Sequence, residues 1–169
     1  ALPSRNRRGV CRTRRGICKP AAERHVARDD RNGPRCHNAL SSGALASLEV
    51  LYLNANQIGD EGMKVFSSAL SSGALASLTR LAFNDNQISD EGMKAFSSAL
   101  SSGALASLYY LYLDNNQIGD EGMKAFSSAL SSGSLNSLTD LYLYNNPASN
   151  SAKDTMKAVA SNRSISLSI

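Results

Sequence analysis

Cysteine and histidine are missing from residues 39–169 of this 169-residue chain. The three cysteines and two histidines of the sequence all precede residue 39, at Cys11, Cys18, His25, Cys36 and His37. Residues 39–169 therefore contain neither a disulfide nor a metal site built from thiolate or imidazole ligands. They also lack the histidine base that a serine nucleophile usually needs, so we expect no catalytic residues, no cofactor and no metal there.

Long apolar runs are absent as well. The longest unbroken runs are a few residues, far short of the roughly 18 that a membrane-spanning helix needs. The arginine-rich start of the chain lacks the apolar stretch of a secretory signal. With 42% hydrophobic and 19% charged residues, the chain has enough apolar material for one folded domain. We therefore expect a soluble, cytoplasmic protein with no membrane partner.

Acidic residues are scarce at the amino-terminal end. Residues 1–38 hold 11 Lys and Arg against 3 acids, about +8, whereas residues 39–169 hold 7 against 11, about −4. The segment 1–38 is also poor in aromatic residues and shows no periodicity, so we expect a basic, disordered tail. Alternatives for it are an organelle transit segment, a zinc site, or a nucleic-acid or nuclear-import patch formed by Arg5, Arg7, Arg8, Arg12, Arg14 and Arg15.

Nine residues, NQIGDEGMK, occur at 56–64 and again at 116–124, and NQISDEGMK stands at 86–94. A catalytic motif is normally needed once, so near-identical copies indicate a structural unit stacked on itself. The copies keep a strict period of 30, which is marked by Asn56, Asn86, Asn116 and Asn146.

Each unit begins with a strand pattern and continues with a helix pattern. The first half follows L-x-x-L-x-L-x-x-N-x-I, and alternating leucines such as Leu51 and Leu53 predict a short strand with one buried face. In the second half Met93, Phe96 and Leu100 fall on one helical face. About four such units fill residues 39–169. Residues 30–43 match the register of a helix from a degraded initial unit.

The helix starts carry paired acids, at Asp60–Glu61, Asp90–Glu91 and Asp120–Glu121. We expect Asp90 to cap its own helix, Gly103 to end that helix in a left-handed conformation, and Gly92 to let helix and strand layers approach closely. Because the pairs recur at every helix start, capping explains them better than carboxylate catalysis or calcium binding.

These repeats resemble the leucine-rich repeats, in particular the long, helix-containing subtype of ribonuclease inhibitor, Ran GTPase-activating proteins and NOD-like receptors. The resemblance covers residues 39–169. It implies an α/β solenoid, a segment of a curved horseshoe with a parallel sheet on the concave side and helices on the convex side. At the asparagine positions, a buried amide can pair with backbone groups of its own and the neighbouring unit, so we expect a structural ladder there.

The residues between the core leucines differ from unit to unit, and they are predicted to face the concave side in rows across the sheet. Tyrosine, a preferred contact residue in protein interfaces, dominates these rows. We therefore predict a protein-binding face formed by Tyr52, Asn54, Arg80, Tyr110, Tyr112, Asp114, Tyr142 and Tyr144.

The predicted function is non-catalytic binding of another protein, whose identity the sequence does not name. One alternative is a GTPase regulator, implied by the Ran GTPase-activating relatives. Another is a nucleic-acid-associated protein that acts through the basic residues 1–38. Because the chain opens on Ala1 and the four-strand face is small, a fragment of a longer repeat array is also consistent with the sequence.

Overall fold

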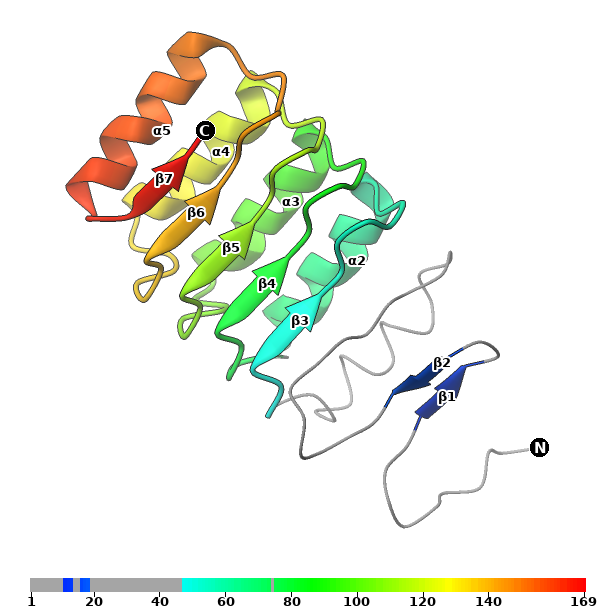
Figure 1. The fold of residues 1–169 in the computed structure, drawn as a ribbon. Coiled ribbons are helices and arrows are strands. Elements are labelled where there is room, and N and C mark those ends of the chain that lie inside the picture. The colour runs from blue at the N-terminus through cyan, green and yellow to red at the C-terminus, as the bar shows by residue number, and fades with distance from the viewer. Residues whose placement is uncertain (1–10, 14–15, 19–46, 74) are drawn as a thin grey trace.

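The computed structural model describes residues 11–13, 16–18, 47–73 and 75–169 (Figure 1). The described residues before 47 form a two-stranded antiparallel ladder of β1 (Cys11–Thr13) and β2 (Gly16–Cys18), with Cys11 opposite Cys18. Most of the residues named in the expectations for 1–38, and the degraded unit expected at 30–43, lie outside the described ranges.

Strands and helices alternate from residue 47 to the end of the chain. The strands are β3 (Val50–Tyr52), β4 (Arg80–Ala82), β5 (Tyr110–Tyr112), β6 (Asp140–Tyr142) and β7 (Ser166–Ser168). The helices between them are α2 (Asp60–Ser71), α3 (Asp90–Ser101), α4 (Asp120–Ser131) and α5 (Asn150–Asn162). The predicted change from strand period to helix period within each unit is confirmed.

The five strands form one parallel sheet in chain order, and the helices lie together on one side of it (Figure 1). Corresponding residues of the repeat pair directly, so Leu51, Leu81, Leu111 and Leu141 stand side by side, followed by Leu167. Because one repeat makes one full coil, every coil places its core leucine on the core leucine of the neighbouring coil. The predicted α/β solenoid is confirmed.

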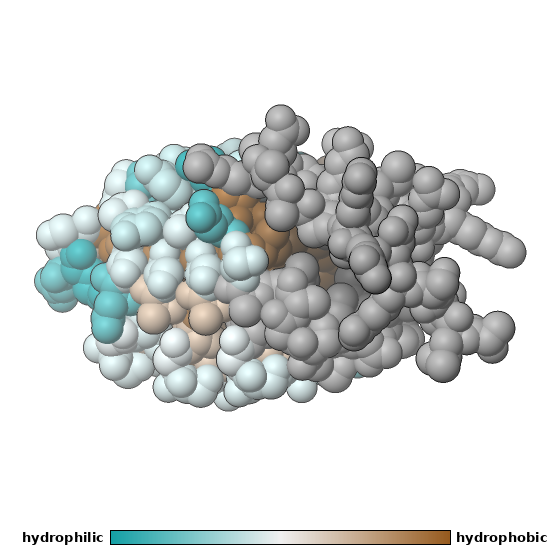
Figure 2. Space-filling view, turned by 90° about the horizontal axis from the view of Figure 1, so that it is seen from below, coloured by the Kyte–Doolittle hydropathy of each residue, from teal (hydrophilic) through white to brown (hydrophobic). Residues whose placement is uncertain are grey.

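The core lies between sheet and helices and is continuous from coil to coil. Four phenylalanine rings run through it, with Phe66–Phe83, Phe66–Phe96, Phe83–Phe96 and Phe96–Phe126 centroid distances of 4.9, 6.3, 6.3 and 6.4 Å. In α5 the equivalent position is Met156, which is fully buried. Seen from below, apolar residues lie between more polar ones (Figure 2). Burial of each large apolar side chain of the core stabilises the fold by roughly 1.5–3 kcal/mol.

A left-handed glycine follows α2, α3 and α4, which confirms the prediction made for Gly103. Gly73, Gly103 and Gly133 have φ of +84°, +88° and +94°, and each donates its backbone N–H to the last buried leucine of its helix. A left-handed residue at this point lets the chain leave the helix and return toward the sheet.

No helix in the described part of the chain is long and apolar enough to cross a bilayer.

Candidate functional site

The turns after β4, β5 and β6 are held by the predicted asparagines Asn86, Asn116 and Asn146. The Asn116 side chain donates to Leu113 O at 3.1 Å in its own coil and to Phe83 O at 3.0 Å in the preceding coil. Its Oδ1 accepts from the Ile88 N–H at 3.1 Å. Asn86 and Asn146 repeat this pattern, and all three residues are buried. The ladder is confirmed, and it fixes the strand ends that carry the candidate binding face.

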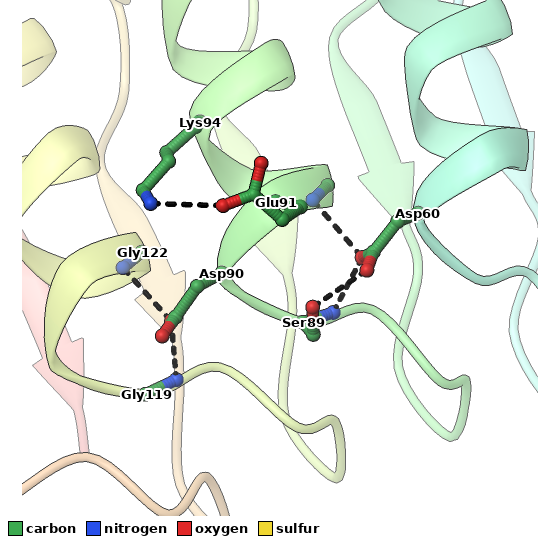
Figure 3. A network of polar contacts seen from close by, with 8 residues as sticks. Asp60, Ser89, Asp90, Glu91, Lys94, Gly119 and Gly122 are labelled. Atoms are coloured by element: carbon green, nitrogen blue, oxygen red, sulfur yellow. Dashed lines mark hydrogen bonds and ion pairs between the residues drawn. The ribbon is translucent and has the colours of Figure 1, made fainter.

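The aspartate at each helix start makes a different contact from the one expected. Ser89, the N-cap residue of α3, makes no side-chain capping bond, and Asp90 is the first residue of the helix itself. Asp90 Oδ1 instead accepts from the Gly119 and Gly122 N–H groups of the next coil, at 2.7 and 2.8 Å (Figure 3). The prediction that Asp90 caps its own helix is therefore wrong, because its carboxylate caps α4.

Asp60 makes the same contact one coil earlier. Its Oδ1 accepts from the Ser89 and Gly92 N–H groups at 2.9 Å each, and its Oδ2 accepts from the Ser89 hydroxyl at 2.6 Å (Figure 3). We call this arrangement the inter-coil clamp: a carboxylate that binds two backbone N–H groups at the start of the next helix. The positive end of that helix favours the bound negative charge.

Glycine at the second clamped position is explained by the carboxylate. A Cβ built on Gly122 would lie 2.6 Å from Asp90 Oδ1, closer than any side chain tolerates. The last coil carries Ala152 at this position, and there Asp120 binds only Ser149, through its N–H at 2.6 Å and its hydroxyl at 2.9 Å. The Ala152 N–H goes to the Ser149 hydroxyl instead, at 3.4 Å. The two-amide clamp therefore occurs where the helix offers glycine.

Because of the clamp, the stability of the fold depends on pH in the acidic range. Hydrogen bonds from Ser149 lower the pKa of Asp120. Partial burial alone would raise the pKa of Asp60, but the bonds from Ser89 and Gly92 outweigh it and leave that pKa lowered as well. A carboxyl with a lowered folded-state pKa stabilises the fold fully above the ordinary aspartate pKa of about 4. This stabilisation is lost as the pH falls through the lowered value.

We therefore expect the melting temperature of the wild type to fall as the pH decreases from about 6 to about 2, and Asp120→Asn to show a smaller fall. Thermal denaturation followed by circular dichroism measures both profiles. Asp154→Asn is the matched control, since Asp154 makes an exposed ion pair with Lys157 and no inter-coil contact among the described residues. Identical profiles for wild type and Asp120→Asn would contradict the assignment.

The concave face is formed by the rows that the register predicted. Strand pairing aligns Arg80 with Tyr110, and Tyr112 with Tyr142. The rings of Tyr112 and Tyr142 stack nearly parallel, with centroids 4.6 Å apart and an interplanar angle of 6°. The Arg80 guanidinium lies over the Tyr110 ring at 4.7 Å, and its Nη1 lies 3.3 Å from the Tyr52 hydroxyl. These half-buried residues therefore form one aromatic stack and one cation–π pair on the same surface.

The pKa values of Arg80 and Tyr112 on this face are shifted by their surroundings. The hydrogen bond to Tyr52 raises the pKa of Arg80, which is already charged at every ordinary pH. Burial raises the pKa of Tyr112, so the stacked ring keeps its hydroxyl proton at neutral pH. Arg80 Nε has no hydrogen-bond partner among the described residues, although the atom is buried. The guanidinium is therefore held by the Tyr52 hydroxyl and the Tyr110 ring, and its Nε–H stays unpaired beneath the surface.

Asp114 differs from the other predicted binding residues. It was expected on the exposed face, but it is only 3% exposed, because Tyr144 and Asn115 cover it. Asn115 Nδ2 donates to its carboxylate at 3.0 Å, and a hydrogen bond to Asp114 raises the pKa of Tyr144. Tyr144 is 41% exposed, and Asn54 is exposed too. Asp114 thus supports Tyr144 and is not an exposed contact residue.

Comparison of the sequence with family models identifies the repeat. The model described as "Leucine Rich repeat" matches three times, at residues 44–67, 74–97 and 104–127, in the same register of three successive coils. These coils are leucine-rich repeats. The ribonuclease-inhibitor-like subtype stays a prediction. No curated protein matches the sequence.

Comparison with solved structures finds two chains that match most of this one. A structure of the leiomodin-1 actin-binding site 2 superposes with a TM-score of 0.64 at 18% identity, over 79% of this chain and 76% of that chain. An internalin, inlF, from Listeria monocytogenes gives a TM-score of 0.42 at 24% identity, over 75% of this chain and 36% of that chain. The leiomodin match shows a common fold and no more.

One exposed aromatic residue of the leucine-rich repeats was not among the predicted site residues. Tyr109 is 46% exposed and stands one residue before β5, where the other coils have Glu49, Thr79 and Thr139. Comparison of the units at this position would have found Tyr109, because a large aromatic residue replaces small or charged ones.

Within the described ranges, no group of three His, Cys, Asp or Glu residues is placed to hold a metal ion.

Proposed function

We propose that this leucine-rich-repeat chain binds another protein, without catalysis, through the concave face of its sheet. The observation that carries the proposal is the stacked pair Tyr112–Tyr142 beside the Arg80–Tyr110 pair. The coils repeat their core and their turns almost unchanged, so side chains that differ between coils and remain accessible are not explained by the fold. Tyrosine and arginine are enriched in the energetic centres of protein interfaces.

Known leucine-rich-repeat proteins support this proposal at a coarser level. Leucine-rich repeats generally mediate protein–protein interaction, and the leiomodin-1 segment with the similar fold is described as an actin-binding site. Actin is therefore one purified partner worth testing. The proposed location is the cytoplasm.

The size of the face sets a condition on the partner. The five strands at about 4.8 Å spacing, with five residues at about 3.3 Å along each strand, give a patch of roughly 320 Å². A standard interface buries about 800 Å² on each partner. The contact therefore includes residues beside the strands, of which Tyr144 and Tyr109 are the exposed large hydrophobic ones in the described part of the chain.

The paired change Tyr112→Ser and Tyr142→Ser tests the proposal. Partners are first captured from a cell lysate on the wild-type chain and identified by mass spectrometry, and the affinity of each purified partner is then measured. Truncation of an aromatic anchor commonly costs about 2 kcal/mol or more, so we expect the paired change to weaken binding at least about thirtyfold. Circular dichroism should show an unchanged fold, since both rings are only half buried.

The matched control is the pair Lys94→Ala and Lys124→Ala, which lies on the exposed helix side. This control should bind the same partners with wild-type affinity. Equal binding by the tyrosine variant would exclude the concave face and point to the helices instead.

A further inference from the structure

The charged residues of 47–169 are divided unequally between the helices and the concave face. All the lysines lie in helices, on the other side of the sheet: Lys64, Lys94, Lys124, Lys153 and Lys157. In the described part of the chain, the strands and the turns that follow them carry one basic residue, Arg80, against the acids Asp85, Asp114 and Asp140. Because Arg80 is already held by Tyr52 and Tyr110, the face has an excess of negative charge.

The carboxylates act on the tyrosines of β5 and β6 from both ends. A hydrogen bond to Asp114 and the charge of Asp114 raise the pKa of Tyr144, and the charge of Asp85 adds to this rise. Burial raises the pKa of Tyr112 most, and the charge of Asp140 adds to it. A negative neighbour disfavours a phenolate and favours a cation. A cationic group placed among these tyrosines is therefore favoured by the charges around it.

The strand register leaves one face of the Tyr142 ring beside a small residue. The rings of Tyr112 and Tyr142 are nearly parallel, at 6°, with centroids 4.6 Å apart. This distance matches the spacing of about 4.8 Å between neighbouring strands, so the ring normals run across the sheet, from β5 toward β7. On the β7 side Tyr142 is in register with Ser168, whose side chain is too short to cover a ring. The second face of the half-buried Tyr142 ring is therefore accessible from the concave side.

This surface already pairs a cation with a tyrosine ring once. The Arg80 guanidinium lies 4.7 Å from the centroid of the Tyr110 ring. A lysine or arginine from another protein can make the same contact with Tyr142, because the face of an aromatic ring attracts a cation. Asp140 lies two residues earlier on the same side of β6, about 6.6 Å away along the strand. Ring and carboxylate together favour a cationic side chain over a neutral or anionic one.

We propose that the partner of the concave face is a protein segment that carries lysine or arginine, and that one of these cationic side chains binds on the Tyr142 ring beside the Asp140 carboxylate. This inference rests on the proposed function, which it narrows to a basic partner. Complementary charge fixes the choice of partner more strongly than its total affinity. An acidic segment would meet like charges at Asp85, Asp114 and Asp140.

Two short synthetic peptides test the inference on the full chain. One alternates lysine with serine, and the other has glutamate in place of each lysine. NMR follows the amide signal of each residue, so binding at the concave face is separated from binding to the basic residues 1–38. The lysine peptide should shift the signals of Tyr142 and Ser168 until they saturate, and the glutamate peptide should leave both unchanged. Followed at Ser168, Asp140→Asn should weaken binding of the lysine peptide about threefold, and Tyr142→Ser about fivefold.

Asp154→Asn is the matched control, because it removes the same charge on the helix side. It should leave the affinity at Ser168 unchanged, and a loss equal to that of Asp140→Asn would overturn the inference, since general electrostatics would then explain the effect. The inference also fails if the lysine peptide leaves Tyr142 and Ser168 unmoved, or if the glutamate peptide shifts them equally.

Failure of this inference is distinguishable from failure of the proposed function. If the peptides contradict a basic partner while the variant with Tyr112→Ser and Tyr142→Ser loses its lysate partners, the concave face binds a protein of different chemistry. If that variant keeps its partners, the proposed function is overturned, and the assignment of a basic partner to this face is overturned with it.

Discussion

Replacing Asn116 with alanine is expected to lower the free energy of unfolding by about 3 kcal/mol, although the residue lies outside any helix or strand. The side chain bonds Phe83 O, Leu113 O and the Ile88 N–H, and all three bonds are buried. Alanine leaves these backbone groups without a partner and without access to water. Each buried unsatisfied group costs roughly 1–3 kcal/mol, so the loss exceeds that of one exposed hydrogen bond.

Gln117→Ala is the matched control for this prediction, because it removes an exposed amide one residue away. Surface substitutions of this kind usually change stability by less than about 0.5 kcal/mol. Chemical denaturation followed by circular dichroism measures both variants. A denaturation midpoint for Asn116→Ala equal to that of Gln117→Ala would contradict the claim that the turn asparagines stabilise the fold.

Replacing Phe96 with alanine is expected to have the largest effect on stability, about 4 kcal/mol. The ring is fully buried and lies 6.3 Å from the rings of both Phe66 and Phe83, and 6.4 Å from that of Phe126. Alanine removes this contact surface and leaves a cavity in the middle of the stack. Because each coil is stabilised mainly by its two neighbours, a cavity in α3 weakens both junctions at once.

Tyr109→Ala is the aromatic control for Phe96→Ala, since Tyr109 is 46% exposed. We expect a much smaller change in the midpoint of chemical denaturation for this variant. Phe96→Leu should fall between the two, because most of the buried volume is kept. A Phe96→Ala midpoint within experimental error of wild type would show that the phenylalanine stack does not hold the coils together.

Much of the fold could be predicted because its signals are local or periodic. The alternation at Leu51 and Leu53 predicts a strand, the spacing of Met93, Phe96 and Leu100 predicts a helix, and Gly103 predicts where that helix ends. The strict period of 30 then fixes which residues pair across the sheet, so the concave rows followed from the sequence and are confirmed by the strand register.

The direction of the clamp carboxylates could not be predicted in the same way. An aspartate at a helix start usually serves the helix that it begins, and sequence reasoning applied that rule to Asp90. In the solenoid the start of the next helix is within hydrogen-bond distance of this carboxylate, and the glycines at 119 and 122 leave room for it. The choice between two nearby helix ends depends on three-dimensional distances, which a single unit of sequence does not contain.

The sequence alone therefore determined the repeat, the core, the turn asparagines and the order of the concave rows, because a period of 30 imposes the same local environment on every copy. The tertiary structure decided which side chains in those rows are accessible. It buried Asp114 beneath Tyr144 and Asn115, stacked Tyr112 on Tyr142, and laid Arg80 over Tyr110. These contacts depend on the side-chain rotamers that adjacent coils leave open to one another, and pairing by register alone does not specify them.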